Sequence, residues 1–166
     1  MNIFSKSLLL ALGIAFSNLV MAQNIAVFSP DKALFATQQA KQLGQELSQQ
    51  LAPQSERLEA LGQKLQLLQQ RFTEDQALMS NEEIQQLQSQ INQQSLEFQK
   101  LNQYIRNAKL QTEQEFLELM RPKLNKVLGA YIEANKIALI VNNSAVVYVQ
   151  DGIDITGAIT ALLDQE

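Results

Sequence analysis

The chain has 166 residues with 13 Lys and Arg against 17 Asp and Glu, and it contains neither Cys nor His. Without Cys there are no disulfides, thiol nucleophiles or thiolate metal sites, and without His there are no Ser-His-Asp triads or His metal sites. The net charge of −4 argues against nucleic acid, which binds proteins largely through phosphate neutralisation, and against broad adhesion to anionic lipid. The length predicts one domain.

Residues 1–22 are expected to be an export signal. Lys6 supplies the positive charge, residues 8–20 are almost unbrokenly apolar, and Val20-Met21-Ala22 places small residues at the cleavage positions. An uncut membrane anchor is the alternative, disfavoured because the apolar run is shorter than the ~20 residues of a comfortable span. Cleavage would leave an exported chain that begins at Gln23 and carries a net charge of −5.

Residues 24–29 (NIAVFS) are β-prone and predict a short first strand. Ser29 is expected to cap a helical turn or two, with Pro30 at the first helical position and Asp31 in the first turn.

Residues 38–120 carry one long helical pattern, interrupted only near residues 73–80. The apolar positions alternate steps of three and four from Leu58 onwards, which is the ~3.5-residue period of a coiled coil. This seam consists of Leu43, Leu47, Leu51, Leu58, Leu61, Leu65, Leu68 and Phe72, then Ile84, Leu87, Ile91, Phe98, Leu101, Ile105 and Ala108. The pattern predicts an antiparallel helical hairpin with arms roughly 50–60 Å long.

Three features of this stretch allow alternatives. The many Gln residues suggest disorder, but the periodic seam favours helix. Pro53 predicts a kink, and the continuing seam disfavours a true break. Ser80 followed by Glu83 is a capping box that marks the start of the second helix.

The hairpin is acidic, with seven Lys and Arg against eleven Asp and Glu from Gln38 to Met120. Carboxylate pairs such as Glu82-Glu83 and Glu113-Glu115 are interpreted as surface charge, since no apolar cleft is predicted that would shift a pKa. No glycine-rich phosphate loop is present. We therefore expect no catalytic residues, no metal site, no cofactor and no enzymatic activity.

The second helix is expected to continue to about Glu133, with a kink or restart at Pro122. The apolar runs 137–141 and 145–149, separated by Asn142-Asn143, predict a β-hairpin. Asp154 is expected to cap a short C-terminal helix.

These elements predict a mostly helical α+β fold. A helical hairpin (38–120) would project from a small β body (23–37 and 121–166). Because the strands are apolar on both faces and the body is small, we expect several protomers to share one β core; a monomer that covers its own sheet is the alternative. The predicted oligomer core consists of Ile25, Val27, Leu139, Val141, Val147 and Val149.

The order of these parts resembles the Skp/OmpH-like family of periplasmic chaperones. The most specific similarity is VNNSAVVY (141–148) followed by Asp154-Ile155-Thr156, and the approach RPKLNKV (121–127) is also similar. The resemblance implies a trimer with a β body and three helical tentacles enclosing a cavity. It also implies an ATP-independent holdase for unfolded outer-membrane proteins, located in the periplasm.

The best-known members are strongly basic, whereas this chain has few arm cations beyond Lys100, Arg106 and Lys109. No lipopolysaccharide site is therefore carried over. Clients are expected to bind diffusely on the inner faces of the tentacles. The cluster Arg121, Lys123, Lys126 and Lys136 is interpreted either as a cationic rim for an acidic partner or as a solvated helix face.

The predicted partners are unfolded outer-membrane proteins and two further copies of the chain. No nucleic acid and at most transient membrane contact are expected. The alternative function is that of a passive coiled-coil spacer or adaptor in the envelope.

Overall fold

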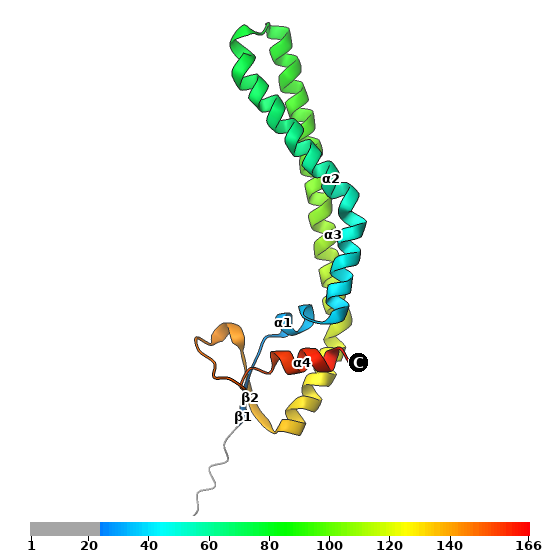
Figure 1. The fold of residues 1–166 in the computed structure, drawn as a ribbon, viewed down its shortest axis with the longest axis vertical. Helices are drawn as coiled ribbons and strands as arrows, with labels where there is room; N and C mark the ends of the chain where they lie inside the picture. The colour runs from blue at the N-terminus through cyan, green and yellow to red at the C-terminus, as the bar shows by residue number, and fades with distance from the viewer. Residues whose placement is uncertain (1–23) are drawn as a thin grey trace, which may run out of the picture.

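The computed structural model describes residues 24–166, so the expected export signal lies outside the described residues. The elements are β1 (Asn24–Phe28), α1 (Pro30–Phe35), α2 (Gln38–Asp75), the 3₁₀ helix η1 (Gln76–Leu78), α3 (Asn81–Asn135), β2 (Ile137–Asn142), the 3₁₀ helix η2 (Asn143–Ala145) and α4 (Thr156–Leu163). Helices α2 and α3 form a long arm, and the strands and the short helices α1 and α4 lie at its base (Figure 1). The expected α+β, mostly α class is confirmed.

The arm is held together by the apolar seam that the periodicity predicted. Leu51 and Leu61 of α2 and Leu87 and Ile105 of α3 are buried, while the Gln-rich positions between the seam residues are mostly exposed. The hairpin closes at η1, and α3 then begins at the predicted capping box. The Ser80 hydroxyl accepts from the backbone N–H of Glu83 at 3.3 Å, and the Glu83 carboxylate accepts from that of Ser80 at 2.8 Å.

Both interior prolines are accommodated within continuous helices. α2 continues through Pro53, so the true break considered for that position does not occur, and α2 changes direction in its central part (Figure 1). α3 likewise continues through Pro122 from the arm into the body, so it does not restart there. Arm and body are therefore joined by one uninterrupted helix.

The sheet has two parallel strands, β1 and β2, and the connection between them contains α1, α2 and α3. This corrects the β-hairpin predicted for residues 137–149, because the second apolar run forms no strand. A two-residue hairpin turn requires positive φ at its centre, and Lys136 is the only non-glycine residue between 24 and 166 with positive φ. Asn142 has a φ of −66° and its side chain accepts from the Ser144 N–H, which starts η2 instead of a tight turn.

β1 has a second neighbour on its other side. The Val27 N–H donates to the Ile153 carbonyl, and the Ile155 N–H donates to the Val27 carbonyl, both at 2.9 Å. These bonds form an isolated parallel bridge between Val27 and Asp154. The expected third strand is thus replaced by a single bridge further along the chain.

The core of the body lies between the sheet, α1, α4 and the last third of α3. Its buried members are Ala26, Phe28, Ala33, Leu34, Phe116, Met120, Leu124, Val127, Ile155, Ile159 and Leu163. Two bonds fix the start of the arm to the body. Buried Thr37, which caps α2 by accepting from the Ala40 N–H at 3.2 Å, donates its hydroxyl to the Leu34 carbonyl of α1 at 2.7 Å. Asp164 at the end of α4 accepts from the Gln38 N–H at 2.8 Å.

Two of the expected caps differ in detail. Ser29 precedes α1 as expected, but its side chain makes no capping bond; its backbone N–H donates instead to Thr156 Oγ1 at 3.0 Å. Ile155, not Asp154, occupies the N-cap position of α4. Asp154 still accepts from the first helical N–H, that of Thr156, at 2.8 Å. The Asp154 carboxylate therefore accepts a hydrogen bond from the first turn of α4 although it lies one residue before the N-cap position.

Candidate functional site

The outward face of the sheet is the first candidate surface. In the parallel register Ile25 pairs with Leu139 and Val27 with Val141, so these four side chains share the face opposite Ala26 and Phe28, which belong to the core. Ile25 is 50% exposed and Leu139 53% exposed, whereas Val27 is buried within the chain. Four of the six residues predicted for an oligomer core thus lie together.

The other two predicted core residues lie in the irregular segment after η2. Val147 is fully exposed, and Val149 is half-buried. Tyr148, between them, is also largely exposed. Within residues 24–166 no strand pairs with the second edge of β2, so that edge presents free backbone donors and acceptors. The body therefore exposes both an apolar face and an open strand edge.

Asp154 fastens this irregular segment to the start of α4. Its Oδ2 accepts from Asn143 Nδ2 at 3.0 Å, in addition to the Thr156 bond at its Oδ1. Hydrogen bonds from the side chain and backbone of Thr156, with a smaller effect from Asn143, hold the pKa of Asp154 below its ordinary value of 3.8. The ionised carboxylate is therefore the form that the folded body favours.

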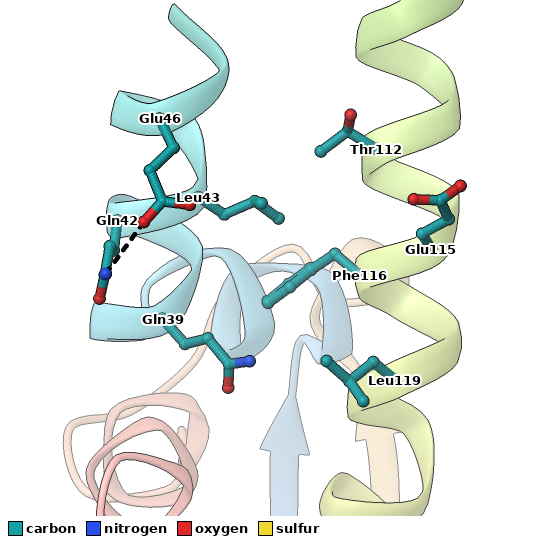
Figure 2. Close-up of a pocket in the computed structure, with 8 residues that line it drawn as sticks. All are labelled: Gln39, Gln42, Leu43, Glu46, Thr112, Glu115, Phe116 and Leu119. Atoms are coloured by element: carbon teal, nitrogen blue, oxygen red, sulfur yellow. Dashed lines mark hydrogen bonds between the residues drawn. The ribbon is translucent and has the colours of Figure 1, made fainter. Parts of the chain in front are cut away.

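The arm root, where α2 and α3 leave the body, contains two cavities. One of about 430 Å³ is lined by Gln39, Gln42, Leu43, Glu46, Thr112, Glu115, Phe116 and Leu119 (Figure 2). Leu43 and Phe116 point toward each other across it. A second cavity of about 260 Å³ shares Leu43, Thr112 and Phe116 and adds Phe35, Gly44 and Leu47. The helices are thus only partly packed where they emerge.

The sequence pattern placed Leu43 and Leu47 in the seam but did not predict a cavity beside them. A signal was available in the spacing of the α3 seam. From Ala108 the buried and half-buried positions step by fours through Thr112, Phe116 and Met120, in place of the alternating threes and fours. Successive steps of four carry the apolar stripe around the helix, away from a coiled-coil seam.

The cations of the expected rim do not converge. Arg121 is exposed and Lys123 half-buried, while Lys126 Nζ is bound to the Glu166 carboxylate at 2.8 Å. Lys136 follows the end of α3, roughly 22 Å along the helix from Arg121, so it does not lie at the arm root. Lys126 instead borders a cavity of about 560 Å³ between α3 and α4, lined also by Tyr131 and Leu162.

The exposed face of the arm is polar and interrupted by single large apolar side chains. Those exposed on the arm include Leu67, Leu78, Leu96, Tyr104 and Leu110. One ion pair, between Arg57 and Glu97, links the two helices midway along their length. A surface of this kind offers many weak apolar and amide contacts rather than one enclosed pocket.

Comparison with known proteins gives this architecture a family. The family model described as outer membrane protein (OmpH-like) matches residues 24–163, which span the body and the arm. The chain belongs to the OmpH-like family. This confirms the resemblance recognised from the segments 121–127 and 141–148.

Individual OmpH-like relatives are distant in sequence. A Skp-like protein of Pseudomonas aeruginosa is 23% identical over 141 residues, which cover 85% of this chain and 84% of the relative. An OmpH-like protein of Caulobacter crescentus, described as a candidate outer membrane chaperone, superposes with a TM-score of 0.54 at 17% identity. That match covers 86% of this chain and 85% of the other, and it shows that the fold is shared.

Between residues 24 and 166, no helix of this OmpH-like chain is both long enough and apolar enough to cross a membrane. In the same residues no three Asp or Glu side chains gather in a way that would hold a metal ion.

Proposed function

We propose that this chain is an ATP-independent periplasmic holdase. It binds unfolded outer-membrane proteins between the helical arms of a homotrimer and prevents their aggregation. Membership of the OmpH-like family supports the chaperone class. The observation that carries the proposal is the combination of a long projecting arm with a body whose outward sheet face remains apolar and half-exposed.

The proposed trimer would cover what a single chain leaves exposed. The Ile25–Leu139 pair, the open edge of β2 and the segment around Val147 are all parts of the body. Contiguous exposed apolar surface and free strand edges are features that soluble proteins normally cover by association. In this arrangement residues 23–37 and 121–166 form the shared body, and each protomer contributes residues 38–120 as an arm.

The proposed activity is binding, with no catalytic step, cofactor or metal. Client contacts would be spread over the inner faces of the arms, because many weak contacts tolerate clients of different sequence. Arg121 and Lys123 would be available at the rim, whereas Lys126 is engaged by Glu166. The proposal places the exported chain in the periplasm, with no nucleic-acid partner and at most transient membrane contact.

Suppression of aggregation tests this proposal. An outer-membrane β-barrel protein unfolded in urea is diluted into buffer without nucleotide, with and without the full exported chain, and light scattering is followed. A holdase should suppress the scattering when the exported chain and the client are mixed at a near-stoichiometric ratio. Unchanged scattering, with a folded chain verified by circular dichroism, would favour a passive envelope spacer and contradict the holdase.

A further inference from the structure

Asp151 is the only Asp or Asn in the chain that is followed by glycine, because every glycine other than Gly152 follows Leu or Thr. The pair lies in the loop between η2 and α4, which projects beside the sheet (orange in Figure 1). The backbone nitrogen after an Asp can attack the carboxyl carbon of that Asp and close a five-membered ring. Glycine favours this reaction because it has no Cβ to obstruct the approach. Local structure then decides whether the ring can form.

The backbone around this pair is a turn that is open to solvent. Asp151 and Gly152 are its central residues, and it is closed by a hydrogen bond of 3.3 Å from the Ile153 N–H to the Gln150 carbonyl. Gly152 has a φ of +86°, and no atom lies within 4 Å of the position that a Cβ would take there. Both central residues are exposed. Nothing in the described chain therefore covers the Asp151–Gly152 peptide bond.

Both reacting groups of this pair are free of partners within residues 24–166. The Gly152 N–H donates no hydrogen bond there, and the Asp151 carboxylate takes part in no hydrogen bond or ion pair. A backbone N–H in a helix or a paired strand would have to break its hydrogen bond before its nitrogen could react. That cost is absent at Gly152.

The neighbouring Asx residues of the same loop are protected in this respect. The N–H that follows Asp154 belongs to Ile155 and donates to the Val27 carbonyl at 2.9 Å. The N–H that follows Asn143 belongs to Ser144 and donates to the preceding residue's side chain at 2.9 Å. The side chains of Asn143 and Asp154 are also bonded to each other at 3.0 Å. The loop thus holds one unprotected Asx residue beside two protected ones.

We propose that Asp151 is a modification site at which the bond to Gly152 rearranges to isoaspartate without an enzyme. The Gly152 nitrogen bonds to Asp151 Cγ and a Cγ–O bond breaks. That oxygen leaves as water, with the amide proton and a second proton from solvent. Water then reopens the succinimide ring. Cleavage of the new N–Cγ bond restores aspartate, whereas cleavage of the original peptide bond gives isoaspartate, so the net change needs no oxidant or reductant and leaves the mass unchanged.

The rearrangement alters the way in which the loop is attached to β1. In isoaspartate the main chain runs through Cβ and Cγ, so the turn gains one backbone atom and the hydrogen bond between Gln150 and Ile153 loses its geometry. The Ile153 carbonyl accepts the Val27 N–H of β1 at 2.9 Å, so the displaced turn acts directly on that contact. The modification therefore loosens the loop from the body as the molecule ages. This inference does not depend on the proposed holdase function.

Peptide mapping of the aged protein tests the site. The full exported chain is kept at physiological temperature for several weeks and digested with trypsin, which releases residues 137–166 as one peptide because no Lys or Arg follows Lys136. Electron-transfer fragmentation cleaves isoaspartate at its Cα–Cβ bond and so locates it. We expect isoaspartate at Asp151 to form at least about tenfold faster than at Asp154, a difference of ~1.4 kcal/mol in the barrier. Equal rates, or none at Asp151, would overturn the proposal.

Two substitutions separate the chemistry from the fold. Asp151→Glu keeps the charge but would have to close a six-membered ring, so it should stay unmodified. Asp151→Asn closes the same ring as aspartate with ammonia as the leaving group, so it should rearrange faster than the unmodified chain. If the folded Asp151→Asn chain does not rearrange while a synthetic peptide of the same loop sequence does, the turn blocks ring closure and the proposal is wrong.

Thermal unfolding of the aged proteins tests the structural consequence. The melting temperature of the aged unmodified chain is expected to fall below that of equally aged Asp151→Glu by roughly 2–4 °C, the effect of losing about one hydrogen bond. Circular dichroism follows the unfolding. Isoaspartate at Asp151 together with equal melting temperatures would overturn the loosening of the loop. An equal fall in both proteins would assign the ageing to another position and overturn it as well.

Discussion

Ile25 and Leu139 lie opposite each other in the parallel register of β1 and β2, and each leaves about half of its surface exposed. The two residues are more than a hundred positions apart in the sequence. Ala26 and Phe28, which alternate with Ile25 along β1 and point to the opposite face of the sheet, are buried in the core. A matched apolar pair beside an open strand edge is costly to leave in water. This relationship is the structural basis for expecting that the bodies associate.

Substitution of Val147 by Asp tests that association. Val147 is fully exposed in the single chain, so a charge there should leave the protomer's helix content and folding unchanged. In the shared core of the proposed trimer the same charge would be desolvated, and we expect that assembly to dissociate. Multi-angle light scattering measures the mass. Leu67→Asp on the arm is the control and should stay trimeric; a Val147→Asp variant of unchanged mass would exclude Val147 from the interface.

Truncation of Met120 should destabilise the junction of arm and body. Met120 is among the largest fully buried side chains, at 1% exposure, whereas its neighbour Leu119 is exposed. Met120→Ala is expected to lower the free energy of unfolding by about 2–5 kcal/mol, through lost apolar contact and a residual cavity. Leu119→Ala should cost far less. Urea unfolding followed by circular dichroism compares them, and equal losses would contradict this description of the core.

The arm-root cavities predict a stabilising substitution. Gly44 lies inside α2, and a Cβ built there has no atom within 4 Å. Gly44→Ala should therefore raise the free energy of unfolding by ~1 kcal/mol, because alanine costs less backbone entropy in a helix.

Gly152→Ala is the informative contrast, and thermal unfolding compares both variants with the unmodified chain. This glycine also has open space around it, but its φ is +86°, where a side chain is strained. It should lower the melting temperature. A rise for both variants would mean that the backbone at Gly152 is not held in this conformation.

Acidification should weaken the body through Asp154. The folded state lowers the pKa of this carboxyl, mainly through Thr156, so the ionised form contributes stability at pH values above the unfolded pKa. That contribution is lost as the pH falls below the ordinary value of 3.8 and through the lowered folded pKa.

The Asp154→Asn variant isolates this effect. It should be less stable than the unmodified chain at neutral pH and should lose less stability on acidification, so that the difference between the two narrows. Urea midpoints at neutral and acidic pH provide the measurement. A constant difference across pH would show that the carboxylate's charge is not what stabilises the start of α4.

The arm was predictable from the sequence because its determinants are local. The spacing of Leu58, Leu61 and Leu65 sets the helical seam within single turns, and the Ser80–Glu83 capping box sets the start of α3 with bonds between residues three apart. The order of the parts and the segment 141–148 were likewise sufficient for the family.

The pairing of the strands was decided only by the tertiary structure. The β propensity of residues 145–149 matches that of a strand, yet β2 pairs with β1, which lies more than a hundred positions earlier. That choice depends on where α3 returns the chain and on a turn at Asn142 whose negative φ does not allow a tight hairpin. Likewise, the face shared by Ile25 and Leu139 exists only because of that long-range register, since residue identity alone does not say which strands become neighbours.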